Sequence, residues 1–299
     1  MSDQTSCGGD AGSSTREVIQ VYKEYAKEYE KEKTRPWRIY MERYSMMNTI
    51  LSQNPTGLDL SGKKVLDLAC GEGIYSRMTA QMGADKVIGV DISQEMLDIA
   101  SSHPSCSSSV ALSTLEYRLG NCMSLDAMKC TLSDMQEGSF DIIICSWLFC
   151  NAKSTAEFSG FAEVIGFYLQ PHTGFFLGTD NYSLADNTLG GDYYAHTHGF
   201  YKKLPEDMTV PAGKIDIHLF NPDVDKEGDM EIVMSLSNYH YPVETMARLF
   251  EQYELELSTP VRPLEVDMSI PEEDKKQFDD LVQSPSFALL QGRKKRACP

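Results

Sequence analysis

Residues 63–77 read KKVLDLACGEGIYSR, and this stretch decides the fold. Its apolar run, Val65 to Leu68, has the length of a buried parallel strand. The turn that follows contains Gly71 and Gly73, which leave no side chain between the backbone and a ligand. The next segment, Ile74 to Met82, has apolar residues at helical spacing. The stretch therefore predicts a strand, a glycine turn and a helix that packs back onto the strand.

A second apolar run ends in a carboxylate. Lys86 to Val90 reads as the next strand, and Asp91 follows it directly. In an open parallel sheet, an acid at the tip of the second strand binds the two ribose hydroxyls of an adenosine. Because Asp67 closes the first strand, we expect the two acids to hold opposite ends of one bound nucleoside.

Two classes of cofactor use this geometry. A dinucleotide site needs a third glycine, so that the helix approaches the strand and its N-terminus holds the pyrophosphate. Here the third position is Ser76. Asp67 and Glu72 would repel a pyrophosphate, whereas they would attract the ammonium group of an amino acid.

The segments DLACGEG (residues 67–73) and VDIS (residues 90–93) resemble those of class I S-adenosylmethionine-dependent methyltransferases. The resemblance implies an α/β, Rossmann-like fold with a mostly parallel seven-stranded sheet and an N-terminal helical lid. It also implies S-adenosyl-L-methionine as cofactor, with S-adenosyl-L-homocysteine as its product. An NAD-type oxidoreductase and a non-catalytic, cofactor-binding partner subunit remain the alternatives.

Tyrosines recur at helical spacing in the segment Glu17 to Lys33. Such a stripe usually packs in a core, but it is similar to the Tyr-rich segment that covers the cofactor in many small-molecule methyltransferases. Aromatic faces stabilise a cation such as a sulfonium by about 0.5–2 kcal/mol. Trp37, with Arg35 or Arg38, is predicted either to contact the cofactor carboxylate or the substrate, or to pack in the lid.

Further cofactor positions follow from the resemblance. Met96 would lie near the adenine or in the core, and Asn121 stands where the family commonly has an Asp that accepts from the adenine amino group. Ser146 follows the fourth predicted strand. The predicted cofactor site comprises Tyr25, Tyr29, Trp37, Asp67, Ala69, Gly71, Gly73, Asp91, Ile92, Met96, Asn121, Cys122 and Ser146.

The predicted activity is methyl transfer, by in-line displacement, to a nitrogen or oxygen of a small-molecule metabolite. The segment after the fourth strand lacks the Asn/Asp-Pro-Pro-Tyr motif of enzymes that methylate nucleobases or protein amides. The acidic composition favours a nitrogen acceptor. Predicted substrate contacts are Tyr22, Trp147, Asn181, Tyr182, Tyr201 and Tyr239. The candidates for a catalytic base are Asp180, His196, His198 and His240, and none is preferred.

The amino-acid composition limits the classes of molecule that are expected as partners. A net charge of -17 argues against nucleic acid and membrane surfaces, since both favour basic proteins. The eight cysteines form no C-x-x-C pair, no signal peptide opens the chain, and no apolar run reaches membrane-span length. No metal is expected, because His196 and His198 lack a third ligand at convincing spacing. We expect a cytoplasmic monomer or homodimer.

Changes in composition divide the chain into five segments. They are a disordered tail (residues 1–16), a helical lid (17–60), a Rossmann-like cofactor-binding core (61–183), an antiparallel insertion that supplies the substrate pocket (184–241), and a C-terminal completion of the core (242–299).

Overall fold

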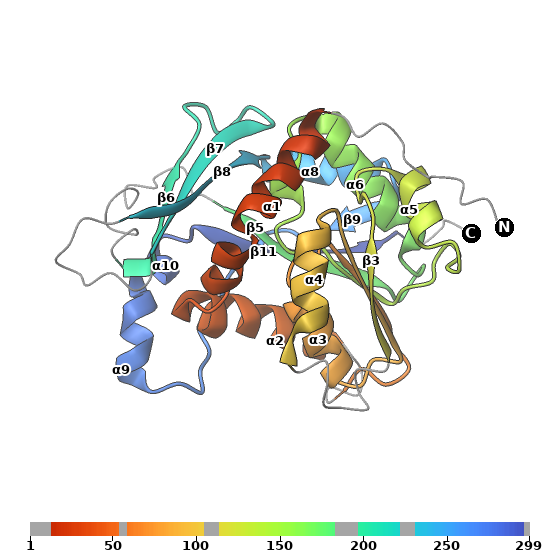
Figure 1. The fold of residues 1–299 in the computed structure, drawn as a ribbon, viewed down its shortest axis with the longest axis horizontal. Coiled ribbons are helices and arrows are strands. Elements are labelled where there is room, and N and C mark those ends of the chain that lie inside the picture. Colours follow the sequence, from red (N-terminus) through yellow and green to blue (C-terminus); the bar gives the residue numbers. More distant parts are fainter. Residues whose placement is uncertain (1–12, 54–58, 105–113, 183–196, 222–230, 296–299) are drawn as a thin grey trace.

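A central sheet of eight strands organises the protein in this computed structural model, which describes residues 13–53, 59–104, 114–182, 197–221 and 231–295 (Figure 1). The order along the sheet is β10-β11-β5-β4-β1-β2-β3, and β9 also pairs with β11. Both β9 and β10 pair with the side of β11 that does not face β5, so the eight strands occupy seven positions. The strands are β1 (Lys64–Leu68), β2 (Lys86–Asp91), β3 (Leu115–Leu119), β4 (Ile142–Ile144), β5 (Phe175–Asn181), β9 (Leu255–Leu257), β10 (Arg262–Pro263) and β11 (Phe287–Lys294).

Strands β1 to β5 are mutually parallel, and β11 runs antiparallel to β5. This mixed, mostly parallel sheet confirms the predicted fold class. Because the carboxyl ends of β1, β2 and β4 meet at one edge, the residues that follow these strands come together there.

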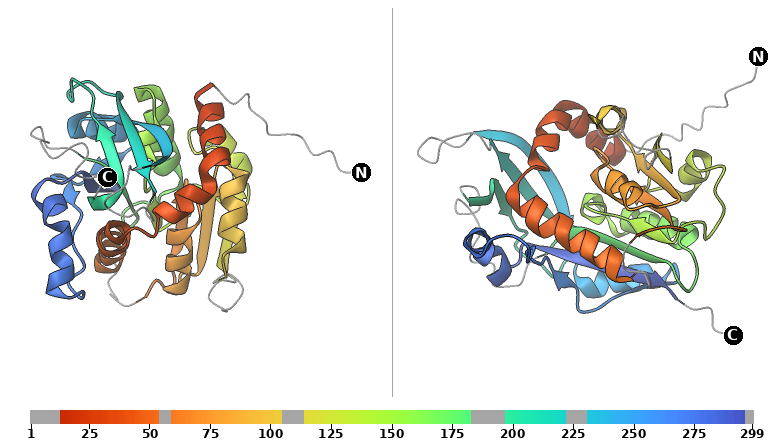
Figure 2. Two further views of the ribbon diagram at one scale, coloured as in Figure 1. Left: turned by 60° about the vertical axis from the view of Figure 1, so that its left-hand side comes forward. Right: turned by 90° about the horizontal axis from the view of Figure 1, so that it is seen from below.

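Successive residues of each central strand face two different cores. Val65 packs in the cluster on one face of the sheet, whereas Leu66 packs in the cluster on the other. This two-residue period lets the near-continuous apolar strands bury both faces. The helices that complete the two layers are α3 (Ile74–Gln81) and α4 (Gln94–Ser102) on one side, and α5 (Leu125–Thr131), α6 (Thr155–Tyr168) and α8 (Val243–Glu251) on the other (Figure 2).

The N-terminal segment consists of α1 (Ser13–Glu32), the π-helix η1 (Arg38–Arg43) and α2 (Tyr44–Gln53). The sequence predicts one continuous α-helix from Trp37 to Leu51. The structure differs, because the π-helix η1 forms the first part of this segment. Helix α1 is kinked at Tyr25, whose φ and ψ are -117° and 18°. Most of the tail predicted for residues 1–16 lies outside the described residues, and α1 begins within it.

A separate three-stranded antiparallel sheet lies between β5 and α8 in the chain. It contains β6 (Phe200–Lys203), β7 (Gly213–Phe220) and β8 (Ile232–His240) in the order β6-β7-β8. Strand β8 contacts α1 and the short 3₁₀-helix η4 (Phe149–Asn151), which follows β4. The predicted antiparallel insertion is therefore present, next to the carboxyl ends of the central strands. Three further short helices in the described residues are α9 (Glu272–Lys275), η5 (Lys276–Phe278) and α10 (Asp279–Gln283).

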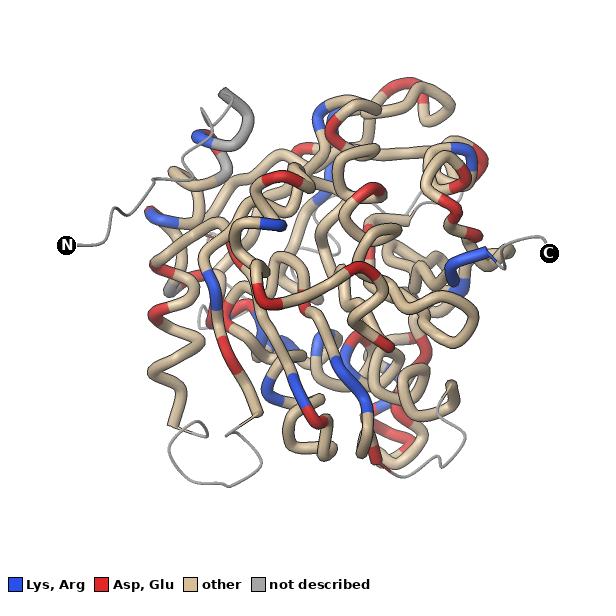
Figure 3. The backbone as a smooth tube through the Cα atoms, turned by 90° about the vertical axis from the view of Figure 1, so that its right-hand side faces the viewer, with Lys and Arg blue, Asp and Glu red and all other residues tan. Residues whose placement is uncertain are grey.

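Acidic and basic positions are interspersed along the chain on the side drawn in Figure 3. None of the helices in the described ranges is long and apolar enough to cross a membrane. The five-segment division stays a prediction.

Candidate functional site

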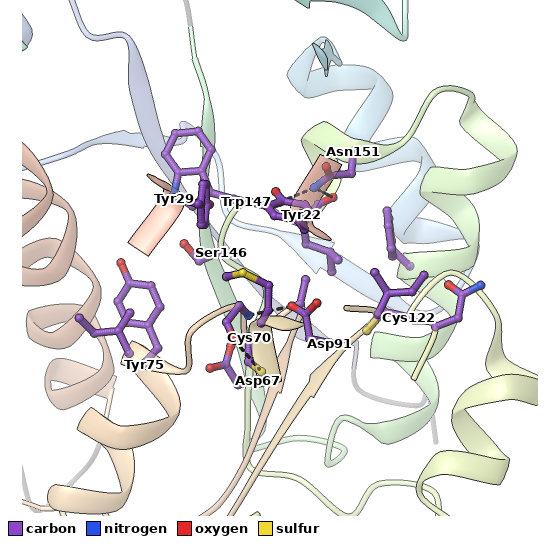
Figure 4. Close-up of a pocket in the computed structure, with 18 of the residues that line it drawn as sticks. Tyr22, Tyr29, Asp67, Cys70, Tyr75, Asp91, Cys122, Ser146, Trp147 and Asn151 are labelled. Carbon is purple, nitrogen blue, oxygen red and sulfur yellow. Dashed lines mark hydrogen bonds between the residues drawn. The ribbon is translucent and has the colours of Figure 1, made fainter. Parts of the chain in front are cut away.

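A cavity opens at the carboxyl ends of β1, β2 and β4, with about 830 Å³ of empty space when the open solvent at its mouth is included (Figure 4). We call it the first cavity. Two of its walls are the turn after β1, which contributes Ala69 and Gly71, and the tip of β2, which contributes Asp91. The sequence prediction of a ligand site at this edge of the sheet therefore coincides with a real cavity.

Asp91 is held by the backbone around it. Its Oδ2 accepts from the amide of Gly71 at 2.8 Å, and its Oδ1 accepts from the amide of Ser93 at 2.9 Å. Burial raises the pKa of this carboxyl group, while these backbone N–H donors act in the opposite direction. An ionised carboxylate offers about four lone-pair positions, so acceptor capacity is left for the hydroxyls of a ligand.

Asp67 also lines the first cavity. Its Oδ2 accepts from the hydroxyl of Ser76 at 2.6 Å. Burial raises its pKa to about 7, and the neighbouring charges of Asp91 and Glu72 contribute in the same direction. A cationic group that entered the cavity would favour the ionised form of this acid.

Glu72 differs from the expectation that it attracts a ligand ammonium. It does not line the cavity: its Oε2 forms a buried ion pair with Arg77 at 2.5 Å. Ser76, at the third position of the glycine pattern, is thus the hydrogen-bond partner of Asp67. Glu72 is paired with Arg77 and does not contribute to the lining. Only Asp67 and Asp91, of the three acids considered, face the cavity.

Left-handed backbone marks the turn and the opposite wall. Gly71 and Gly73 have φ values of 55° and 77°, and Ala69 and Trp147 have φ values of 55° and 59° without being glycine. Such conformations cost about 1–3 kcal/mol for non-glycine residues and cluster at functional sites. Gly73 is required for a second reason, because a Cβ there would lie 2.2 Å from the hydroxyl oxygen of Tyr117.

The structure brings most of the predicted cofactor residues to the first cavity. The lining includes Tyr29, Asp67, Ala69, Gly71, Asp91, Ile92, Met96, Asn121, Cys122 and Ser146. Asn121 already accepts through Oδ1 from the amide of Met123 at 3.0 Å. Burial raises the pKa of Cys122 to about 12, so its thiol stays neutral.

Three predicted cofactor residues lie elsewhere. Tyr25 sits at the kink of α1 and faces Glu24 rather than the cavity. Gly73 caps α3 beneath Tyr117. Trp37 is stacked on Phe287 with ring centroids 4.5 Å apart and lines a different cavity, described below.

The lid contributes two tyrosines and a lysine to the first cavity. Tyr22 and Tyr29 pack edge to face at 5.3 Å, and the ammonium of Lys33 lies 5.0 Å from the centre of the Tyr29 ring. Lys33 was not predicted: the expected cations, Arg35 and Arg38, are instead paired with Glu32 at 2.5 Å and with Glu42 at 2.6 Å. The sequence did contain a signal for Lys33, because this cationic residue follows Tyr29, the last of the regularly spaced tyrosines, by one helical turn.

Sequence reasoning also missed Glu42, a buried carboxylate in η1 that connects the lid to the core. Its Oε1 accepts from the hydroxyl of Tyr75 at 2.7 Å and from the indole N–H of Trp147 at 2.9 Å. Its Oε2 accepts from Arg38 at 2.6 Å. Although burial alone would raise the pKa of Glu42, the Arg38 charge and these hydrogen bonds lower it to about 2. The carboxylate is therefore ionised throughout the physiological range.

A second cavity of about 480 Å³ adjoins the first and shares Tyr22, Tyr29, Trp147 and Asn151 with it. The antiparallel sheet supplies much of its wall, and η1 and β11 supply the rest. The other residues that line the second cavity are Trp37, Arg38, Cys150, Phe200, Lys202, Ile217, Leu219, Leu236, Asn238 and Phe287.

Of the predicted substrate contacts, Tyr22 and Trp147 line both cavities. Asn181 lies behind the second cavity, where its amide donates to Asn238 at 3.1 Å. Tyr182 packs with the core on the opposite face of the sheet, and Tyr201 stacks on His218 at 5.9 Å. Tyr239 lines a separate surface hollow with Tyr22.

The three described candidates for a base line neither cavity. Asp180 is buried behind Lys202, with a pKa that burial raises to about 7. Nε2 of His198 lies 2.8 Å from Asp280. Burial lowers the pKa of both His198 and His240. His196 lies outside the described residues, and within the parts of the chain that are described no three metal-ligating side chains come together.

Comparisons with known proteins agree with this geometry. Residues 65–166 match the family model described as "Methyltransferase domain". A "Ubiquinone biosynthesis O-methyltransferase" of Burkholderia ambifaria is 28% identical over 169 residues, covering 54% of this chain and 66% of the relative. A protein of the same name from Idiomarina loihiensis is 37% identical over 86 residues, or 29% of this chain and 30% of the relative. The chain thus spans at most about two thirds of these relatives.

The fold of an S-adenosylmethionine-dependent methyltransferase from Clostridium acetobutylicum is similar, with a TM-score of 0.55. The identity is 14%, and the match covers 92% of this chain and 99% of that one. At this identity the similarity concerns the fold.

The charged groups that line the first cavity are complementary to those of S-adenosylmethionine. Asp91 lies where ribose hydroxyls bind, Asp67 offers a carboxylate for an ammonium, and Lys33 offers a cation for a carboxylate. Gly71 lets the backbone approach the ligand closely, since even a Cβ there would lie 3.3 Å from Met96. The residues 65–166 that match the methyltransferase model therefore supply most of the lining of this cavity.

Proposed function

We propose that the protein transfers a methyl group from S-adenosylmethionine to an oxygen or nitrogen of a small molecule. The observation that carries this proposal is the pair of adjoining cavities. One is lined by the glycine turn and by the acids of β1 and β2, and the other is walled by the antiparallel sheet. Trp147 belongs to both, so a donor and an acceptor would meet at this residue.

Three charged residues and three aromatic residues of the first cavity have distinct parts in the proposed reaction. Asp91 binds the ribose, Asp67 binds the amino group and Lys33 binds the carboxylate of the donor. When bound, the cofactor supplies a methyl group that its positively charged sulfur already activates. The faces of Tyr22, Tyr29 and Trp147 are suited to a cation, since aromatic rings attract cations where water is excluded.

The protein contributes mainly alignment. Fixing two reactants in a productive geometry supplies about 7–11 kcal/mol in well-oriented intramolecular reactions. The lid helix α1 crosses the cavities and adds Tyr22 to the walls of both, which limits the access of water. An oxygen acceptor benefits from a base, and an amine must lose its proton before it attacks.

The alternatives receive no specific support. The first cavity has carboxylates where a dinucleotide would need to place its pyrophosphate, which argues against an NAD-type oxidoreductase. A monomeric or homodimeric state, a cytoplasmic location and the absence of nucleic-acid and membrane partners stay predictions from the sequence.

Two experiments test the proposal. In calorimetry, S-adenosylhomocysteine should bind and NAD should not; tight NAD binding without binding of S-adenosylhomocysteine would refute the proposal. Incubation with radiolabelled donor and a metabolite extract should then label a small molecule. Cofactor binding without any labelled product would instead support a non-catalytic, cofactor-binding subunit.

A further inference from the structure

The second cavity is aromatic and apolar over most of its wall, yet the charged residues that line it are both cations. Arg38 and Lys202 line it, and no Asp or Glu does so among the residues described. Arg38 lies between two rings, 4.3 Å from the centre of Trp37 and 4.8 Å from that of Trp147. An ammonium-bearing acceptor would therefore find no carboxylate on the wall, and it would meet the cation of Lys202, since the charge of Arg38 is already paired with Glu42.

Two buried donors on the same wall lack an acceptor. The indole N–H of Trp37 and the Nε–H of Arg38 have no hydrogen-bond partner within the described parts of the chain. These side chains are 2% and 6% exposed. An unmet buried donor costs about 1–3 kcal/mol, and a ligand oxygen would recover part of this cost only if these side chains shifted to expose an N–H to the cavity.

Lys202 also has spare hydrogen-bonding capacity. Its ammonium donates to the carbonyl of Ser286 at 2.6 Å and to Oδ1 of Asn181 at 3.3 Å, and it lies 4.4 Å from the centre of the Phe287 ring. An ammonium has three donors, so one is left over. Asp180 acts on Lys202 electrostatically without forming an ion pair with it, and it does not line the cavity.

From these contacts, and resting on the function proposed above, we propose that the second cavity holds a mostly apolar, ring-sized acceptor whose acidic oxygen group lies against Lys202. A phenol and a carboxylic acid share this chemistry. The inference favours oxygen as the methylated atom, and it departs from the preference for nitrogen that the acidic composition suggested.

The protonation of Lys202 supports this assignment. Burial lowers its pKa to about 7, so a fraction of the side chain is a neutral amine at neutral pH. The amine nitrogen accepts the proton of the acceptor's O–H group: one O–H bond breaks, one N–H bond forms, and an oxygen anion is left beside an ammonium. Attraction between these two ions would favour the form of the acceptor that attacks a methyl group.

The test uses the full chain saturated with S-adenosylhomocysteine, so that the first cavity is filled. The probes are para-butylphenol, para-butylbenzoic acid, para-butylbenzylamine and para-butylanisole. The chain has two tryptophans, Trp37 and Trp147, and both line the second cavity, so intrinsic tryptophan fluorescence reports its occupancy directly. The phenol or the benzoic acid should bind at least about tenfold more tightly than the amine and the anisole.

The relative affinity of the phenol and the benzoic acid distinguishes the two acidic groups. Tighter binding of the benzylamine, or no binding by any of the four probes, would overturn the inference. Neither result would affect the proposed function as long as S-adenosylhomocysteine binds, whereas failure of that binding would count against the proposed function itself.

Variants of two adjacent lysines provide a matched comparison. Lys202→Met should weaken the acidic probe about tenfold or more, since hydrogen bonds to charged groups contribute about 1.5–3 kcal/mol. Lys203→Met changes the next residue of β6, which is exposed, and it should leave this affinity unchanged. Unaltered affinity for S-adenosylhomocysteine would show that both variants are folded, and equal effects of the two substitutions would contradict the role of Lys202.

Discussion

Replacing Glu42 with glutamine should destabilise the protein strongly, although it changes a single atom of the side chain. The glutamine side chain would keep an oxygen that accepts from Tyr75 and Trp147. It would lose the charge that is paired with Arg38 at 2.6 Å. Because Arg38 is 6% exposed and Glu42 is 1% exposed, water cannot take the place of the missing partner. Removing one member of a buried pair typically costs about 3–5 kcal/mol.

The pKa of Glu42 gives an independent measure of how much the charge of this residue stabilises the folded state. A fall from the ordinary value of 4.5 to about 2 means that the folded state favours the ionised form by about 3 kcal/mol, at about 1.4 kcal/mol for each pH unit. Because the pKa is lowered on folding, this stabilisation is complete above pH 4.5 and is lost as the pH falls towards 2. The stability difference between the native protein and Glu42→Gln should therefore shrink over that window.

Urea denaturation at neutral pH and at pH 3 measures both effects. Glu116→Gln is the matched control, because Glu116 also pairs with an arginine, Arg118, at 2.6 Å but is 46% exposed. Exposed pairs contribute about 0–1 kcal/mol, so the control should lose less than about 1 kcal/mol. The double variant Arg38→Met/Glu42→Gln should recover much of the loss. If Glu42→Gln lost no more stability than Glu116→Gln, the account of the buried pair would be wrong.

Three further predictions concern the first cavity and its turn. Asp91→Asn should weaken S-adenosylhomocysteine binding in calorimetry by about tenfold or more, since hydrogen bonds to a charged acceptor contribute about 1.5–3 kcal/mol; unchanged affinity would show that Asp91 does not bind the ribose. It is a better test than Asp91→Ala, which would also leave the amides of Gly71 and Ser93 without their acceptor. Affinity for S-adenosylhomocysteine should fall as the pH drops below about 7, because Asp67 becomes protonated and no longer attracts an ammonium. The variant Asp67→Asn should bind with an affinity that depends less on pH. An equally steep pH dependence in that variant would show that another group causes it. Gly73→Ala should lower the melting temperature more than Gly62→Ala, since both glycines have φ near 78° but a Cβ meets Tyr117 only at Gly73; equal losses would mean that Tyr117 moves aside at little cost.

The central part of the fold was predictable because its signals are local. The apolar run Val65 to Leu68, the glycine turn and the acid after β2 lie within 29 residues of one another, from residue 63 to residue 91. Each follows from strand length, backbone freedom or the position of a strand end. The predicted positions at the turn, at the tip of β2 and after β3 line one cavity for the same reason.

The residues that were missed depend on contacts between distant segments. Glu42 has hydrogen-bond partners 33 and 105 positions away, Tyr75 and Trp147, and nothing in the sequence around η1 indicates them. Tyr25 was misplaced because the kink of α1 interrupts the helical spacing that groups it with Tyr22 and Tyr29. Local spacing cannot anticipate a kink that tertiary packing imposes.

Lys202 is a different case, because a local signal existed. Phe200 and Lys202 are two residues apart in β6, so they point to the same face of the sheet, while Tyr201 and Lys203 point to the other. The burial pattern follows this alternation, with Phe200 and Lys202 buried. A lysine at every-second-residue spacing from an aromatic residue, in a segment read as a strand, is uncommon enough on a buried face to be singled out.

Trp147 connects these observations. Its left-handed backbone conformation turns the chain sharply after β4, and its indole N–H donates to Glu42, which fixes the ring. The fixed ring borders both cavities. Since the lid residue Glu42 holds a ring that borders both cavities, the position of the lid and, under the proposed function, the alignment of donor and acceptor would depend on the same hydrogen bond. Under the proposed function, the strain at Trp147 is thus located where a small displacement would change the distance between the methyl donor and its acceptor.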